Sequence, residues 1–178
     1  MKAKLREDRS EAVVPNEVWA MDFDHDQLAT GRKLRALTVI DTYSRYCPPL
    51  DARFSYRGKN VVATLDRICR QTGYPMTIWV DQGSELISRD LDLRAYQNDV
   101  TLDLSRPGKP PDNAFNEAFN GRSRAQCLNA HWFMSLVDAA EELEAWRRDY
   151  NWQRPHSAIG NNVPAALMSS AHESSSCA

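Results

Sequence analysis

The sequence lacks three features that would assign it to whole classes of protein. It has no apolar run long enough to cross a membrane, so we expect no membrane partner. No two of its four cysteines form a Cys-x-x-Cys pair, which argues against a zinc site (Cys47, Cys69, Cys127 and Cys177). Its net charge is −2, so it lacks the overall positive field of many nucleic-acid-binding proteins. A local basic patch is still compatible with this net charge.

What the chain does have is a group of acids at alternate positions after an apolar run. In WAMDFDHDQLATG these acids are Asp22, Asp24 and Asp26. A calcium loop of the EF-hand type starting at the first acid would need Gly and Glu where the chain has Gln27 and Lys33. In a strand, the three acids would share one face. Two interpretations stay open: a solvated strand face, or an acid that belongs to a metal-dependent active site.

Two further acids have surroundings that fit a site or an ordinary surface. Asp81 ends the apolar stretch TIWVD and Gly83 follows it, which is typical both of a ligand at a sheet edge and of a simple turn. On a helical projection, Glu117 lies on a polar face, away from Phe115 and Phe119. That glutamate also fits a solvated surface helix.

The order of the expected elements indicates an α/β protein. Strands are predicted at residues 18–26, 35–41, 46–54, 77–81 and 100–104. Helices are predicted from about Val61 to Gly73 and across residues 90–98, 113–129 and 135–151. The stretch SRPGKPPDN, residues 105–113, is a loop by composition. This order suggests a mixed sheet covered by helices.

Five motifs follow one another along the chain: WAMDF (19–23), VIDTYSRY (39–46), VDQGSEL (80–86), SRPGKPPDNAFNEAFNGRSRAQCLN (105–129) and WRRDYNWQRPHSAIGNNVPAAL (146–167). Together they resemble the catalytic core of insertion-sequence transposases and retroviral-type integrases, the DDE superfamily. The 35 residues between Asp81 and Glu117 match the gap between the last two acids of that family. The resemblance implies a ribonuclease-H-like fold, with a mixed five-stranded sheet flanked by helices.

The resemblance also implies a reaction and the residues that perform it. It makes Asp22, Asp81 and Glu117 both the catalytic acids and the metal ligands of a polynucleotidyl transferase. The implied function is metal-dependent DNA strand cleavage and strand transfer during transposition. Carboxylates suit two Mg²⁺ ions, for which Mn²⁺ can substitute, because hard cations prefer oxygen ligands.

The implied partners are DNA and other protein chains. The family would bind element ends and target DNA as a homo-oligomer. Because only 21 residues precede Asp22, end recognition would need a separate helix-turn-helix protein or a full-length transposase. Roles for Arg154 and His156 stay open. The DNA contacts that we expect lie on or just before the helix of the third acid: Lys109, Asn113, Asn120 and Arg124.

The expected organisation is an N-terminal arm at residues 1–14, a catalytic core at 15–168 and a disordered tail at 169–178. Since no secretory signal opens the chain, we expect a cytoplasmic, nucleoid-associated location in a bacterium.

Several residues depart from the family pattern. Gln82 and Leu86 replace the Asn and Phe of the family motif Asp-Asn-Gly-x-Glu-Phe. Asn116 and Ser123 stand where apolar residues are usual, and Arg94 stands where an aromatic residue is usual. Each would weaken packing by about 1–3 kcal/mol if its position is buried. The alternative function is therefore a truncated, non-catalytic remnant that binds DNA or the full-length transposase.

Overall fold

A five-stranded mixed sheet forms the centre of the molecule. The computed structural model describes residues 9–81, 83, 85–106 and 114–175, with side chains as far as residue 169. The sheet order is β3-β2-β1-β4-β5. β1 pairs antiparallel with β2, and β2 with β3, whereas β1–β4 and β4–β5 are parallel. The strands are β1 (Val18–Gln27), β2 (Lys33–Asp41), β3 (Asp51–Arg53), β4 (Thr77–Val80) and β5 (Thr101–Leu104).

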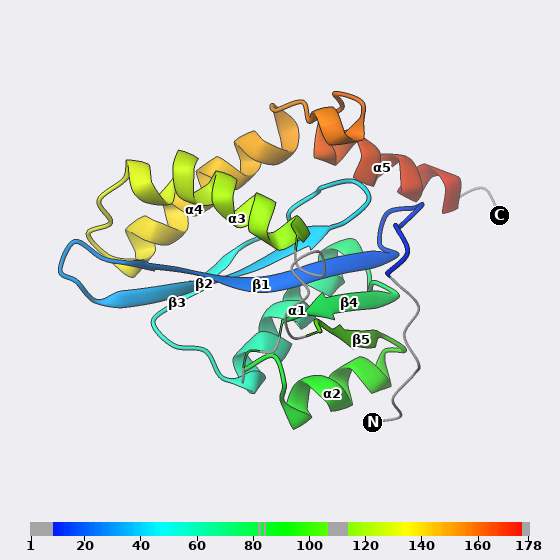
Figure 1. Cartoon of the computed structure of the whole chain (residues 1–178), viewed down its shortest axis with the longest axis horizontal. Helices are drawn as coiled ribbons and strands as arrows, with labels where there is room; N and C mark the ends of the chain where they lie inside the picture. The colour runs from blue at the N-terminus through cyan, green and yellow to red at the C-terminus, as the bar shows by residue number, and fades with distance from the viewer. Residues whose placement is uncertain (1–8, 82, 84, 107–113, 176–178) are drawn as a thin grey trace.

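Helices cover both faces of this sheet. Figure 1 shows α3 and α4 over one face and α1 and α2 over the other. The helices are α1 (Gly58–Thr72), α2 (Arg89–Gln97), α3 (Ala114–Gln126), α4 (Leu136–Trp152) and α5 (Pro164–Ser175), with short 3₁₀ turns η2 (Leu128–Ala130) and η3 (Ser157–Ile159). Across the described ranges, none of these helices combines the length and the apolar content that a membrane crossing requires.

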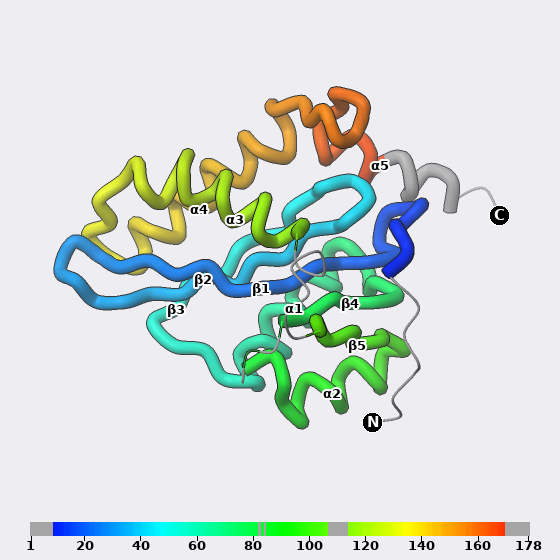
Figure 2. The backbone as a smooth tube through the Cα atoms, in the orientation of Figure 1, coloured from blue at the N-terminus to red at the C-terminus, as the bar shows by residue number. Residues whose placement is uncertain are grey.

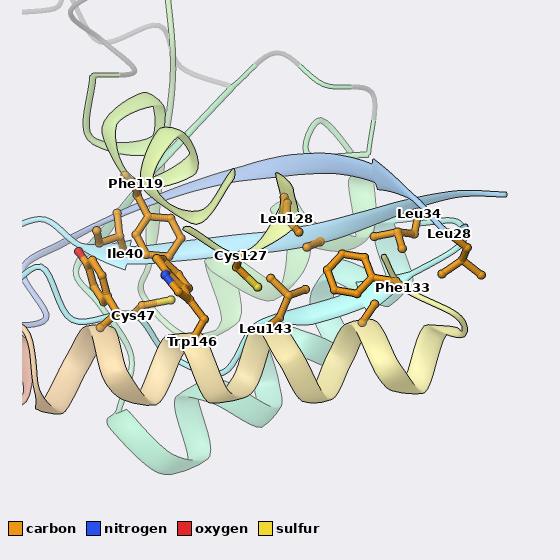
Figure 3. Packing of buried hydrophobic residues seen from close by; sticks show 14 of the residues in the cluster. Leu28, Leu34, Ile40, Cys47, Phe119, Cys127, Leu128, Phe133, Leu143 and Trp146 are labelled. Carbon is orange, nitrogen blue, oxygen red and sulfur yellow. The ribbon is translucent and has the colours of Figure 1, made fainter. Parts of the chain in front are cut away.

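Alternation along β1 divides the core into two clusters. Trp19, Met21 and Phe23 pack with α1 and α2, while Val18 and Ala20 belong to the cluster beneath α3 and α4. Figure 3 shows this second cluster between the sheet and the helix α4. The predicted separation of apolar and acidic positions on the first strand is confirmed, because period-2 alternation sends successive side chains to opposite faces.

β1 and β2 form a long hairpin. Its register runs from Trp19 opposite Asp41 to Gln27 opposite Lys33. Gly31 has φ +87°, a value that favours glycine, and it closes the turn by donating its N–H to the Leu28 carbonyl at 2.8 Å. In Figure 2 the tip of the hairpin lies beside the connection between α3 and α4. The sequence prediction of a hairpin with Gly31 in its turn is confirmed.

Two elements differ from the sequence expectation. The third strand covers only Asp51–Arg53, not residues 46–54, because Pro48 and Pro49 lack the N–H groups that a sheet ladder requires. α5 continues to Ser175, so helix occupies residues 169–175 of the segment expected as a disordered tail. Proline in the first turn, followed by alanine, leucine and methionine, favours this helix.

Candidate active site

The parallel pairing of β1 and β4 brings two of the candidate acids to neighbouring positions. Met21 lies opposite Val80 in the register, so the next residues, Asp22 and Asp81, stand level with each other where β4 ends. Adjacent strands lie about 4.8 Å apart. The alternation of the two strands assigns both positions to the face covered by α3. Both acids are half-buried.

The Asp22 side chain is held by its own strand and by α3. Its Oδ1 accepts a hydrogen bond from the Phe23 N–H at 2.7 Å, and its Oδ2 accepts one from Asn120 Nδ2 at 3.4 Å. The hydroxyl of Thr38 on β2 donates to the Asp22 carbonyl at 3.0 Å. The Oδ1 of Asn120 is buried and has no hydrogen-bond partner within the described residues. Asn120, a predicted DNA contact, therefore lies beside Asp22 with an unsatisfied oxygen.

Glu117 lies one helical turn before Asn120 on α3 and is exposed. Residues three apart share a helix face, so the two side chains start from the same flank. Within the described ranges, no three His, Cys, Asp or Glu side chains lie close enough together to hold a metal ion. The structure thus brings Asp22 and Asp81 to level positions but does not draw Glu117 into a three-carboxylate cluster with them.

A buried acid that neither open interpretation anticipated fixes α3 against β1. Asp24 is only 4% exposed, so its part of the strand face is not solvated. It accepts a hydrogen bond from Ser123 Oγ at 3.1 Å and forms an ion pair with Arg124. Arg124 also donates to the His25 carbonyl at 2.7 Å. These contacts set the position of α3, and hence of Glu117, along β1.

The comparisons with known proteins decide the family. Two family models, both described as Integrase core domain, match residues 12–110 and residues 98–164. The chain belongs to the integrase core domain family. The resemblance of its motifs to transposases and integrases is confirmed.

Curated relatives of this integrase core domain come from bacterial insertion elements. It is 46% identical over 151 residues to the uncharacterized 31.7 kDa protein of IS407 from Burkholderia multivorans, covering 85% of this chain and 54% of that protein. It is 40% identical over 152 residues to the uncharacterized 39.2 kDa protein of IS476 from Xanthomonas euvesicatoria, covering 85% and 44%. The chain therefore spans about half the length of these relatives.

Solved structures confirm the ribonuclease-H-like fold. A chain of the simian T-cell lymphotropic virus intasome superposes with a TM-score of 0.78 at 15% identity, over 89% of this chain and 56% of that one. The HTLV-2 integrase catalytic core domain in complex with magnesium, in its trimeric form, superposes with a TM-score of 0.67 at 14% identity, over 88% and 98%. At these identities the likeness shows the fold alone.

The residues that depart from the family pattern differ in how far they are buried. Asn116 and Ser123 are buried, but the hydroxyl of Ser123 is satisfied by Asp24. Leu86 is buried in the core beneath α1 and α2. Arg94 is half-exposed and donates to Asp66 on α1 at 2.7 Å, so it costs no apolar packing. Three sequence predictions lie outside the described residues: Lys109, Asn113 and the role of Gln82.

In this integrase core, the RPHS segment follows α4 in the chain and contacts both α3 and α4. Arg154 pairs with Asp149 and also donates to Gln126 at the end of α3. His156 is buried, and its Nδ1 lies 2.6 Å from Nη1 of Arg122 on α3. Neither role follows from the sequence alone, and Arg122 was not among the predicted site residues. Its place between two conspicuous residues of the helix, Asn120 and Arg124, was the signal available.

Proposed function

We propose that this chain is the catalytic domain of a DNA transposase that cuts and joins DNA strands with divalent metal ions. The observation that supports the proposal is the level position of Asp22 and Asp81 on neighbouring parallel strands, with α3 fixed across β1. Glu117 is the third acid in this proposal. Its side chain is exposed, so a change of its rotamer would let it join the two aspartates when DNA and metal bind.

The residues present fit hard divalent cations. Carboxylate oxygens are the preferred ligands of Mg²⁺ and Mn²⁺. Beside Asp22, the buried amide oxygen of Asn120 has no hydrogen-bond partner among the described residues, so it could accept a hydrogen bond from a group that binds there. We assign the ions to Asp22, Asp81 and Glu117. When bound, two ions would activate the attacking oxygen and stabilise charge on the leaving oxygen.

The side chains of the protein supply position. Asp22 is oriented by the Phe23 N–H and by Asn120, so its carboxylate is aimed before substrate arrives. In the first step, water attacks a phosphodiester at an element end, and the bond to the leaving oxygen breaks to free a 3′-hydroxyl. In the second step, this hydroxyl attacks a phosphodiester of target DNA. Asn120 and Arg124, with Lys109 and Asn113, would contact the strand beside the scissile bond.

A second candidate function is a non-catalytic domain that binds DNA or a full-length transposase. The observation that favours it is the exposure of Glu117 together with the lack of a three-carboxylate group among the described residues. In either case the complete assembly, a homo-oligomer on DNA with or without a helix-turn-helix partner, would involve more than this chain.

A nicking assay separates the two candidates. An end-labelled duplex is incubated with the full chain in Mg²⁺, in Mn²⁺ and in a chelator. We expect metal-dependent nicks, and a loss of about 100-fold or more in Asp22→Asn and Asp81→Asn. Asp99→Asn is the matched control, because Asp99 is exposed and its φ of +56° suits asparagine. DNA binding without metal-dependent nicks would support the non-catalytic candidate, and nicking retained in Asp81→Asn would refute the assigned site.

A further inference from the structure

A cavity of about 240 Å³ lies along the flank of α3, beneath the RPHS segment. Phe119 and Tyr150, both buried, contribute aromatic surface, and Phe115 adds a third ring. Figure 3 shows Phe119 beside Ile40, another lining residue, at one end of the buried cluster. Most of the lining is apolar, and small side chains leave room for a ligand: Ala114 and Ala118 on α3, and Ala158 on η3.

Two guanidinium groups give this cavity a positive charge. Arg45 stacks over the Phe115 ring at 4.2 Å, and burial lowers its pKa, so its charge is incompletely solvated. Arg122 lies on the α3 side. None of the described lining residues carries a carboxylate. An adjoining cavity that shares Arg45 includes the carboxylate of Glu11, so the first cavity is the better place for an anion.

His156 fixes the orientation of Arg122. The imidazole Nδ1 accepts a hydrogen bond from Arg122 Nη1 at 2.6 Å, and Nε2 faces the Tyr150 carbonyl at 3.4 Å. Both contacts are satisfied when Nε2 carries the only ring proton, and burial lowers the pKa of His156, which favours this neutral form. The ring also packs edge-on against Tyr150, with centroids 4.6 Å apart. Arg122 is therefore held toward the cavity by a neutral acceptor that does not cancel its charge.

We propose that this cavity binds one nucleotide of a DNA strand, with the base against the aromatic rings and its phosphate on Arg45 and Arg122. The volume is below the roughly 300 Å³ of the smallest drug-sized pockets, which suits a single base. Aromatic surface beside guanidinium groups is the pattern that holds single-stranded nucleic acid. This inference rests on the proposed action on DNA.

The position of the cavity relates it to the candidate active site. Ala118 follows Glu117 directly, and at about 100° per residue it lies on the opposite flank of α3 from Asn120. A strand that crosses α3 would thus have one phosphate near Asp22 and another nucleotide in the cavity. The cavity would anchor DNA beside the bond to be cut, and it would not take part in the chemistry.

Filling the cavity tests base binding. Fluorescence anisotropy is measured with a labelled single-stranded oligonucleotide in a chelator, so that no cleavage is needed. We expect Ala118→Leu to raise the Kd about tenfold and to lose the preference for the intact oligonucleotide over one with abasic sites. The control, Ala125→Leu, makes the same change at an exposed position of the same helix that does not line the cavity, and it should bind as the original chain does. Melting curves confirm that both variants fold.

Removing the charge tests the phosphate contact. Arg122→Gln should raise the Kd and flatten its dependence on salt, whereas Arg70→Gln, at an exposed position of α1 on the other side of the sheet, should change neither. The proposal is overturned if the chain binds no oligonucleotide, if Ala118→Leu binds like Ala125→Leu, or if abasic and intact oligonucleotides bind equally well. Failure of the proposed catalytic function would appear separately, as absent nicking with the binding results unchanged.

Discussion

The two faces of the sheet are built differently. Beneath α1 and α2, Trp19, Met21 and Ile68 belong to one continuous apolar cluster. Beneath α3 and α4, apolar side chains share the interior with buried polar groups whose hydrogen-bond partners lie on other segments of the chain: Asp24, Ser123, Arg147, Asn151 and His156. The α1–α2 face is held mainly by apolar packing. The α3–α4 face carries the candidate active site and the cavity.

The polar contacts of the second face hold helices in defined positions. Apolar packing is non-directional, whereas a hydrogen bond to a buried acceptor specifies distance and angle. Asn151 and Arg147 of α4 both donate to the Cys47 carbonyl, at 2.7 and 3.0 Å. On α3, Ser123 and Arg124 converge on Asp24. Buried polar groups therefore fix the orientation of the helices that must present functional side chains.

The largest effect should come from the apolar face and should affect stability alone. Ile68 is 1% exposed within the α1–α2 cluster. Ile68→Ala should lower the free energy of unfolding by about 2–5 kcal/mol, through lost burial and a residual cavity. Urea unfolding followed by circular dichroism measures this change. Below the melting temperature, the variant should bind an oligonucleotide as tightly as the original chain does. Weaker binding by the folded variant would contradict the view that the α1–α2 face affects stability alone.

An intermediate effect should come from the contact between Asp24 and α3. Asp24→Asn removes the charge but keeps the volume, and it should cost about 1–3 kcal/mol because Ser123 and Arg124 lose a charged acceptor. The nicking rate should fall by more than the loss of folded protein explains, since α3 carries Glu117. Arg124→Gln and the double variant complete a double-mutant cycle. A coupling above about 0.5 kcal/mol is expected for groups in contact. Strictly additive losses would show that the pair does not position α3.

The sequence predicted the strands better than it predicted the polar contacts of the α3–α4 face. Alternation on β1 and the apolar stretches at residues 35–41 and 77–81 predicted strands correctly, because one strand's pattern is a local property. The pairing of Asp24 with residues about 100 positions later could not be read locally. The three acids were assigned by resemblance, and that assignment stays a prediction. The basic groups of the cavity were missed because Arg45 and Arg122 come together only in the fold.

The smallest effect concerns pH. Burial is the main cause that lowers the pKa of His156 below its ordinary 6.5, with a contribution from Arg122. The unfolded chain therefore binds the proton more readily, and the free energy of unfolding should decrease as pH falls below about 6.5, by at most about 1.4 kcal/mol per pH unit. The pKa of His25 is lowered as well and adds to this loss of stability, whereas the raised pKa of Asp41 stabilises the folded chain at acidic pH. Comparison with a variant that lacks His156 separates its contribution from theirs.

His156→Asn is the informative variant, because its amide oxygen can still accept from Arg122 but does not titrate in this range. Unfolding of both proteins in urea is followed between neutral and mildly acidic pH. The original chain should lose more stability than the variant on acidification, and its oligonucleotide affinity should weaken as protonation of Nδ1 displaces Arg122. Parallel stability curves would mean that His156 keeps its ordinary pKa, and the contact with Arg122 would then not depend on a neutral imidazole.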